Sequence, residues 1–182
     1  MKYMNQSNVD TAVFDLRAET RTAAGVDRLY AVVSDLPGSS RWSPECVGGR
    51  WLTGRPGVVG SVFEGHNLRE PDVVAWAPVV RGTWHTQAEV VAAEPGRTFQ
   101  WAMRDSAGNR QDSVWGFDIE PAGDATRLVH HFRMGALTEG MRGIVADMSD
   151  QEMERFFAEW GAKVEGDLAV TLERIRALVE TA

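Results

Sequence analysis

Six segments between residues 47 and 134 alternate apolar and polar side chains, and they limit the possible folds more than any other feature of the sequence. A period of two is typical of half-buried β-strands. Five of the segments follow one another through short turns rich in glycine, proline, asparagine and aspartate. Short connections favour antiparallel neighbours, so the sequence predicts an antiparallel meander. The predicted strands are Val47–Leu52, Val58–Leu68, Thr83–Ala92, Arg97–Arg104, Ser113–Glu120 and Thr126–Met134.

The last segment of the chain is predicted to form one long helix. Ser149 and Glu152 have the spacing of a capping box, in which each side chain satisfies an amide that the first helical turn leaves free. An apolar stripe with helical spacing follows. Gly161 and Gly166 interrupt the helix at a cost of about 1 kcal/mol each, which suggests that something approaches it closely there. The stripe consists of Phe157, Trp160, Val164, Leu168, Leu172, Ile175 and Val179.

Three elements are expected before the meander. Residues Thr11–Ala23 alternate like a strand, Val26–Asp35 has the spacing of a short amphipathic helix, and Trp42–Glu45 fits a second short helical turn or a loop. With the meander and the long helix, these elements predict an α+β fold. A curved antiparallel sheet of about seven strands would wrap around the C-terminal helix.

The connection between residues 69 and 82 is too apolar for an ordinary solvated turn, since it contains two prolines and Trp76. It is interpreted either as a loop packed on the edge of the domain, or as a lid over a cavity or a contact in a homodimer. Long ordered loops often carry function, so both interpretations stay open.

Length and charge bound the class of protein. The chain has 182 residues, which fits one domain, predicted over residues 11–182 with residues 1–10 as an N-terminal tail. Its 19 basic and 26 acidic residues give a net charge of -7, so neither nucleic acid nor an acidic membrane surface is an expected partner. With a single cysteine, Cys46, and no signal-peptide or membrane-span pattern, a cytoplasmic location is expected.

The strand alternation also assigns side chains to the inner face of the sheet. That face is mostly aromatic, with Asn67, Thr86 and His130 as its few polar members. Small residues stand beside the large rings, so the interior either interdigitates tightly or leaves a pocket with apolar walls and a few polar groups. The inward positions with aromatic rings include Phe63, Phe99, Trp84, Trp101, Trp115, Phe117 and Phe132.

The order of elements resembles the helix-grip fold of the START-like, SRPBCC superfamily, in the branch called polyketide cyclase/dehydrase and lipid transport. The resemblance covers residues 11–180. It implies an internal hydrophobic cavity for a small organic molecule, and it adds Trp42 and Trp51 to the expected cavity wall. The residues that carry it are Trp42-Ser43-Pro44-Glu45, Trp51, Gly60, Phe63-Glu64-Gly65-His66-Asn67, Trp84, Glu94-Pro95-Gly96-Arg97, Phe99, Trp115, Phe117, Glu120-Pro121, Thr126-Arg127 and Thr171-Leu172.

His130 and Asn67 are the candidate catalytic residues. Burial would keep the His130 imidazole neutral and let it act as a general acid or base, while Asn67 would hold a substrate carbonyl. In the structural alternative both only satisfy hydrogen bonds of the interior. Glu45, four residues after Arg41, is interpreted mainly as half of a solvated helical salt bridge, and Cys46 as a small apolar filler.

Several potential metal ligands lie on two neighbouring predicted strands. Glu64 and His66 share one face of a strand, and His85, Gln87 and Glu89 share a face of the next, so a cluster is conceivable. The alternation places both sets outward, where polar residues are usually only solvated. No metal and no cofactor is therefore expected.

What the resemblance implies, taken with these residues, leads to two main hypotheses. The first is a cofactor-independent cyclase or dehydratase that acts on an aromatic or polycyclic substrate; the second is a carrier or sensor that binds a hydrophobic ligand without catalysis. A third, an interaction module, would use residues 73–80 as a dimer contact. The expected ligand-binding residues are Trp42, Trp51, Phe63, Trp84, Thr86, Trp101, Trp115, Phe157, Trp160 and Gly161.

Overall fold

The computed structural model describes residues 11–181, so the predicted tail, residues 1–10, lies outside the described residues. Within this range, seven strands form one antiparallel sheet in the order β1-β7-β6-β5-β4-β3-β2. The predicted meander is therefore confirmed, and β1 closes the sheet beside β7. The elements are β1 (Phe14–Thr22), α1 (Val26–Val33), the 3₁₀ helix η1 (Leu36–Arg41), β2 (Cys46–Thr53), β3 (Val62–Arg69), β4 (Gly82–Glu94), β5 (Thr98–Arg104), β6 (Arg110–Ala122), β7 (Ala125–Met134), α2 (Glu139–Val145) and α3 (Asp150–Glu180).

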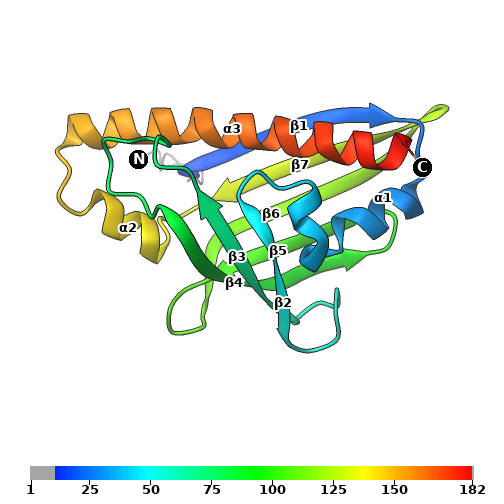
Figure 1. Cartoon of the computed structure of the whole chain (residues 1–182), viewed down its shortest axis with the longest axis horizontal. Coiled ribbons are helices and arrows are strands. Elements are labelled where there is room, and N and C mark those ends of the chain that lie inside the picture. The colour runs from blue at the N-terminus through cyan, green and yellow to red at the C-terminus, as the bar shows by residue number, and fades with distance from the viewer. Residues whose placement is uncertain (1–10, 182) are drawn as a thin grey trace, which may run out of the picture.

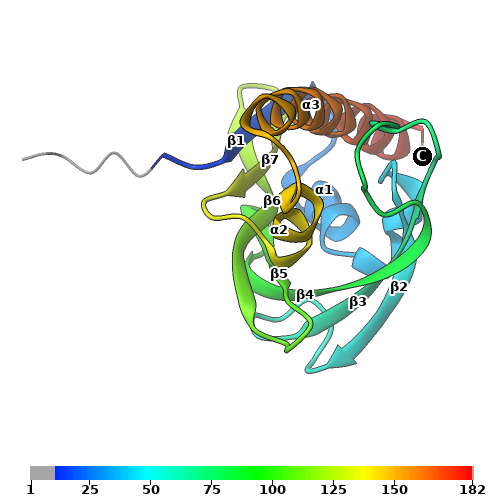
Figure 2. The same ribbon diagram turned by 90° about the vertical axis from the view of Figure 1, so that its left-hand side faces the viewer.

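The sheet curves around the interior, and α3 runs across its open side, beside β1 and β7 (Figure 1). Figure 2, viewed from the end, shows the strands as an incomplete ring with α3 along one side. Regular alternation of side chains lets one face of such a sheet point inward along its whole width. The α+β helix-grip prediction is confirmed by this arrangement.

The capping box predicted for the long helix is present. The Ser149 hydroxyl accepts from the Glu152 amide, and the Glu152 carboxylate accepts from the Ser149 amide at 2.8 Å. The buried stripe differs from the prediction at its first member. Phe156 is fully buried, because its spacing of four residues to Trp160 continues the stripe, whereas Phe157 is only partly buried and packs on Phe14.

Three short segments refine the predicted elements. Of the two interpretations of Trp42–Glu45, the loop is confirmed. The short helical turn lies just before it, at η1, where the Asp35 side chain accepts from the Gly38 amide and Pro37 occupies the first turn. Strand β3 begins at Val62 instead of Val58, after a loop in which Gly57 and Gly60 have positive φ angles. Helix α2 was not predicted; the Thr138 hydroxyl caps it by accepting from the amide of Met141.

The buried side chains form two clusters. One surrounds α1, η1 and the second half of α3, with Phe99, Phe117 and Leu172 at its centre. The other surrounds α2 and the first half of α3, with Phe132, Phe156 and Leu168. The sheet and α3 connect these clusters, and the space between them is available for a cavity.

The connection from residue 69 to residue 82 is an ordered loop beside the first half of α3 (Figure 1). The Arg81 guanidinium donates hydrogen bonds to five of the loop's own carbonyl groups. Trp76 donates to the Glu159 carboxylate at 2.7 Å and lies under Arg155, and Ala77 and Val79 are buried. The apolar composition of the loop is thus used largely in packing on α3.

No helix within residues 11–181 is long and apolar enough to cross a membrane.

Candidate ligand-binding cavity

A cavity of about 450 Å³ lies between the inner face of the sheet, α3, η1 and α2. Its volume is in the range of small-molecule binding sites. The sheet contributes the side chains that alternation had placed inward, from β3 to β7. Among the predicted site residues, those that line the cavity are Trp42, Phe63, Asn67, Trp84, Thr86, Trp101, Trp115, His130 and Trp160.

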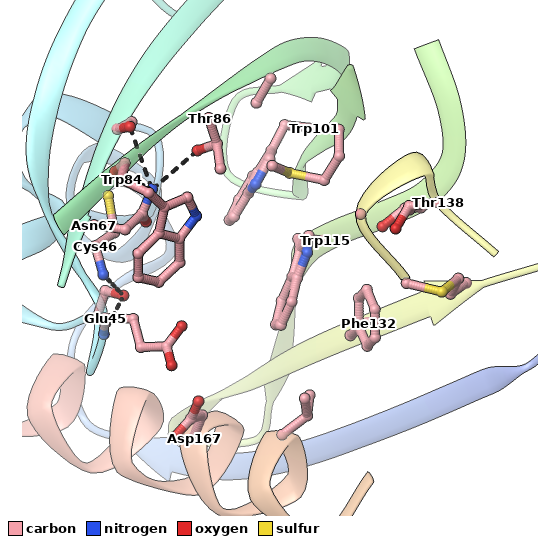
Figure 3. A pocket seen from close by; sticks show the side chains of 18 of the residues that line it. Glu45, Cys46, Asn67, Trp84, Thr86, Trp101, Trp115, Phe132, Thr138 and Asp167 are labelled. Atoms are coloured by element: carbon pink, nitrogen blue, oxygen red, sulfur yellow. Dashed lines mark hydrogen bonds between the residues drawn. The ribbon is translucent and has the colours of Figure 1, made fainter. Parts of the chain in front are cut away.

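One part of the wall is aromatic. The rings of Trp115 and Phe132 stack with their centroids 4.1 Å apart, and the Trp101 ring stands beside them (Figure 3). Helix α2 covers this part with Met141 and Ile144. Flat apolar surfaces of this kind favour a flat ligand, because ring faces gain both apolar burial and stacking.

The other part of the wall carries four charged side chains. The Arg69 guanidinium donates to both carboxylate oxygens of Glu45, at 2.8 and 2.9 Å. Lys163, on α3, bonds to the same carboxylate and lies 2.6 Å from the Asp167 carboxylate. The carboxylates of Glu45 and Asp167 point toward the same space (Figure 3). We call Glu45, Arg69, Lys163 and Asp167 the charged cluster.

Two indole rings hold the charged cluster in place. The Arg69 guanidinium carbon lies 4.3 Å from the ring centre of Trp84 and 4.8 Å from that of Trp160. Arg69 is only 9% exposed, so its charge is stabilised by Glu45, by these rings and by the Val80 carbonyl, to which it donates at 2.8 Å. The hydrogen bonds of Arg69 within residues 11–181 use three of its five N–H groups.

The two carboxyl groups of the charged cluster are tuned in opposite directions. Burial acts to raise the pKa of Glu45, but hydrogen bonds from Arg69 and the charge of Lys163 outweigh it and lower that pKa. For Asp167, burial is the larger effect, and it raises the pKa although Lys163 opposes it. The cavity therefore holds one firmly ionised carboxylate and one carboxyl group that takes up a proton more readily.

His130 lies on β7 with its ring stacked on Phe117, at 4.0 Å between centroids. Its Nδ1 is 2.8 Å from the Gly116 carbonyl oxygen, which makes Nδ1 the protonated nitrogen and leaves Nε2 as an acceptor. Burial lowers the pKa of His130 to about 3. The imidazole is thus neutral near pH 7, as expected, but its conjugate acid is too strong to serve as the resting general acid.

Asn67 uses its amide nitrogen within the protein. Nδ2 lies within donating distance of the Thr86 hydroxyl, at 3.2 Å, and of the carbonyl groups of Gly65 and Trp84 (Figure 3). The N–H groups that would hold a substrate carbonyl are therefore engaged. The carbonyl oxygen of the side chain is the atom that Asn67 offers to a ligand.

Three predicted wall residues are not brought to the cavity. Trp51 packs edge-on against Phe63, behind the wall, with ring centroids 5.4 Å apart. Gly161 faces Phe14 on β1, where an added Cβ atom would lie 3.4 Å from that ring, and Phe157 packs on the same ring. These two positions are rotated around α3 from Trp160, toward β1, so the close approach inferred for Gly161 is to a strand.

The sequence prediction missed Arg69, Lys163 and Asp167, and it paired Glu45 with the wrong arginine. Arg41 bonds to Asp35 at 3.1 Å instead, because η1 ends at Arg41 and no helix joins it to Glu45. Lys163 and Asp167 have the i, i+4 spacing of a helical ion pair, which was a usable signal. Nothing local indicated that Arg69 would reach Glu45.

A sheet that grips a long C-terminal helix around an internal cavity is the architecture of the START-like, SRPBCC superfamily. Within it, the family model described as polyketide cyclase/dehydrase and lipid transport matches residues 14–180. The chain belongs to this family, which confirms the resemblance found in the sequence. A comparison with curated protein sequences gave no significant match.

Solved structures agree with this assignment. A Polyketide_cyc-like protein from Corynebacterium glutamicum, known from solution NMR, is 26% identical with a TM-score of 0.61, and the match covers 93% of each chain. The ZhuI aromatase/cyclase from a Streptomyces species is 16% identical with a TM-score of 0.60, and the match covers 92% of this chain and 93% of that one. Identity at the level of ZhuI supports the fold alone.

A third similar structure is a larger protein. The di-domain ARO/CYC StfQ from the steffimycin biosynthetic pathway is 12% identical with a TM-score of 0.65. The match covers 94% of this chain and 51% of StfQ, so the chain spans about half the length of that protein.

Proposed function

We propose that this chain is a cofactor-independent cyclase or dehydratase that acts on a flat, largely apolar substrate with carbonyl groups. The observation that carries this proposal is the charged cluster, which faces an otherwise aromatic cavity. Charged groups taken out of water are costly, and a carrier of apolar ligands has no need of them. The description of the family, polyketide cyclase/dehydrase and lipid transport, supports the same class of reaction.

The charged cluster contains the groups that an intramolecular aldol reaction needs. The free N–H groups of Arg69 and Lys163 hold a substrate carbonyl and stabilise the enolate oxygen. The Asp167 carboxylate removes a proton from the carbon next to that carbonyl. The carbanion attacks a second carbonyl carbon, and the proton held by Asp167 passes to the resulting alkoxide to give a hydroxyl group. In the dehydration, the Asp167 carboxylate removes the second proton of the same carbon, a carbon–carbon double bond forms as the hydroxyl group leaves, and that proton passes to the hydroxyl to give water and restore the carboxylate. The raised pKa of Asp167 suits it to these transfers.

His130 and Asn67 have a supporting role in this proposal. Both offer acceptor atoms, Nε2 and Oδ1, which can receive hydrogen bonds from substrate hydroxyl or enol groups. Thr86, bonded to Asn67, fixes its orientation. Trp101, Trp115 and Phe132 orient the substrate by stacking on it.

The alternative is a carrier or sensor that uses the same cavity without catalysis. Two observations favour this alternative. Burial lowers the pKa of His130 to about 3, so the ring carries no proton to donate as an acid at neutral pH, and the amide nitrogen of Asn67 already bonds to the Thr86 hydroxyl. In this hypothesis the aromatic wall binds the ligand by stacking, and the charged cluster binds a polar end of the ligand.

The loop between residues 69 and 82 is proposed to close one end of the cavity as a fixed wall. Arg69 and Val80, at its two ends, line the cavity, and Arg81 and Trp76 hold the loop in one conformation on α3. A loop tied in this way is a poor candidate for a lid that opens. The homodimer contact proposed for residues 73–80 would use the exposed residues of this segment, Ala75, Pro78 and Val80.

Conversion of an open-chain poly-β-ketone thioester tests the proposal. Mass spectrometry should detect loss of water and a cyclised product that appears faster with the protein than without it. Asp167→Asn should slow this conversion by about a hundredfold or more, which is the usual contribution of a general acid-base group. Glu165→Gln is the matched control, because Glu165 is an exposed acid on the same helix and should be dispensable.

The carrier hypothesis makes the opposite prediction. If no thioester is converted while a dihydroxyanthraquinone still binds in the cavity, the enzyme proposal is wrong and the carrier hypothesis stands.

A further inference from the structure

A second cluster, of one glutamate and two histidine side chains, lies on the outer face of the sheet, away from the cavity. Strands β3 and β4 pair so that His66 stands directly opposite His85. Glu64, two residues before His66, lies on the same outward face. The ligand atoms of these three side chains all lie within 4.8 Å of one another. The sequence prediction had considered these residues and assigned them to solvation alone.

We propose that Glu64, His66 and His85 form a surface site for a divalent transition-metal ion, with Zn²⁺ as its simplest occupant. Two imidazole nitrogens and one carboxylate oxygen are ligands that Zn²⁺, Ni²⁺ and Cu²⁺ accept, whereas Ca²⁺ and Mg²⁺ prefer sites built from oxygen alone. Three protein ligands on an open face leave at least one coordination position to water.

The geometry is close to what such an ion requires. The rings of His66 and His85 stack with centroids 4.4 Å apart, and His66 Nε2 is 3.2 Å from the Glu64 carboxylate. Ligand atoms around a tetrahedral Zn²⁺ lie about 3.3 Å from each other, given Zn–N bonds of about 2.0 Å. His66 is partly exposed and His85 is exposed, so small side-chain rotations can bring the ligand atoms together.

Neighbouring charges both favour and oppose a cation here. The Glu64 carboxylate brings a negative charge to the site, where it contacts His66 and accepts a hydrogen bond from Arg50. Arg50 Nε lies 3.1 Å from the same carboxylate and competes with the metal for it, but Arg50 is 69% exposed and can turn away. Farther along the face, Arg104 bonds to Gln87 at 3.2 Å. Arg50 is therefore the residue whose removal should improve metal binding.

Titration of the metal-free full chain with ZnCl₂, followed by calorimetry, tests this site. We expect one Zn²⁺ per chain, with affinity increasing with pH because bound imidazole must be unprotonated. His85→Asn should weaken binding by about tenfold or more, because it removes one of the three proposed ligands. Arg50→Gln should tighten binding. Glu89→Gln, a carboxylate of the same β4 face outside the cluster, should leave it unchanged.

Two further measurements make the test decisive. Zn²⁺ should raise the thermal midpoint of the wild-type chain and not that of His85→Asn, because an ion that binds only the folded state stabilises it. MgCl₂ should have no effect. Zn²⁺ binding of equal strength in wild type, His66→Asn and His85→Asn would overturn the proposal, as would the absence of any Zn²⁺ binding by the wild-type chain.

Discussion

Arg69 and Glu45 form a bidentate ion pair in the wall of the cavity, which joins the end of β3 to the chain just before β2. Two parallel N–H···O bonds fix both the position and the orientation of the carboxylate. Because this pair leaves Glu45 ionised and Arg69 with free N–H groups, it sets the electrostatics of the whole charged cluster.

Breaking this pair should destabilise the fold. Arg69→Met removes the main partner of a largely buried carboxylate, and losses of about 3 kcal/mol are typical in that situation. Urea denaturation should show the decrease in the free energy of unfolding. Arg41→Met is the matched control, because its pair with Asp35 is about half exposed and should cost less than about 1 kcal/mol. Equal losses in the two variants would contradict the assigned role of Arg69.

Asp167 should make stability depend on pH in a defined direction. Its pKa is higher in the folded chain than its ordinary value of 3.8, so its contribution to stability is complete below that value and is lost as pH rises through the raised pKa. The free energy of unfolding of wild type should therefore fall relative to that of Asp167→Asn as pH rises. Urea denaturation of both proteins over a pH series measures this difference. A difference that stays constant or increases with pH would show that the pKa is not raised.

His130 should stay neutral throughout the working range of pH. Burial lowers its pKa to about 3, so the carbon signals of its ring in NMR spectra should not move between pH 8 and about pH 5. A ¹⁵N NMR spectrum of the ring should show the proton on Nδ1, which bonds to the Gly116 carbonyl oxygen. A titration step near the ordinary histidine pKa of about 6.5 would instead mean that the ring reaches water.

The two adjacent phenylalanines of α3 should differ in their contribution to stability. Phe156 is fully buried, and its replacement by alanine should cost about 3 to 5 kcal/mol, as expected for a large core ring. Phe157→Ala is the matched control, because it makes the same substitution at the next position of the same helix. It removes only a partly buried ring beside Phe14, so the loss of unfolding free energy should be clearly smaller. Chemical denaturation compares the two. The reverse order would place the apolar stripe where the sequence prediction put it.

The sequence was informative wherever structure depends on local periodicity. Alternation correctly placed Trp84, Trp101, Trp115 and His130 on one inner face, because side chains in a strand can point only to one side or the other. The capping box at Ser149 was equally clear, because both of its hydrogen bonds are made within four residues.

Interactions between distant parts of the chain could not be predicted from local sequence patterns. Arg69 meets Glu45 only because β3 returns beside β2, and Lys163 joins them only because α3 crosses the open side of the sheet. Gly161 illustrates the converse. Its spacing on α3 was compatible with a cavity, yet the rotation of the helix turns it toward Phe14.

The proposed function depends on a flat aromatic molecule binding in the cavity, and the indole signals of the tryptophans test this directly. The chain has seven tryptophans. On titration with a dihydroxyanthraquinone, the indole N–H signals of Trp42, Trp84, Trp101, Trp115 and Trp160 in NMR spectra should shift, because these rings line the cavity. Those of Trp51 and Trp76, which lie outside it, should stay in place. Shifts confined to Trp51 and Trp76, or no shifts at all, would contradict the claim.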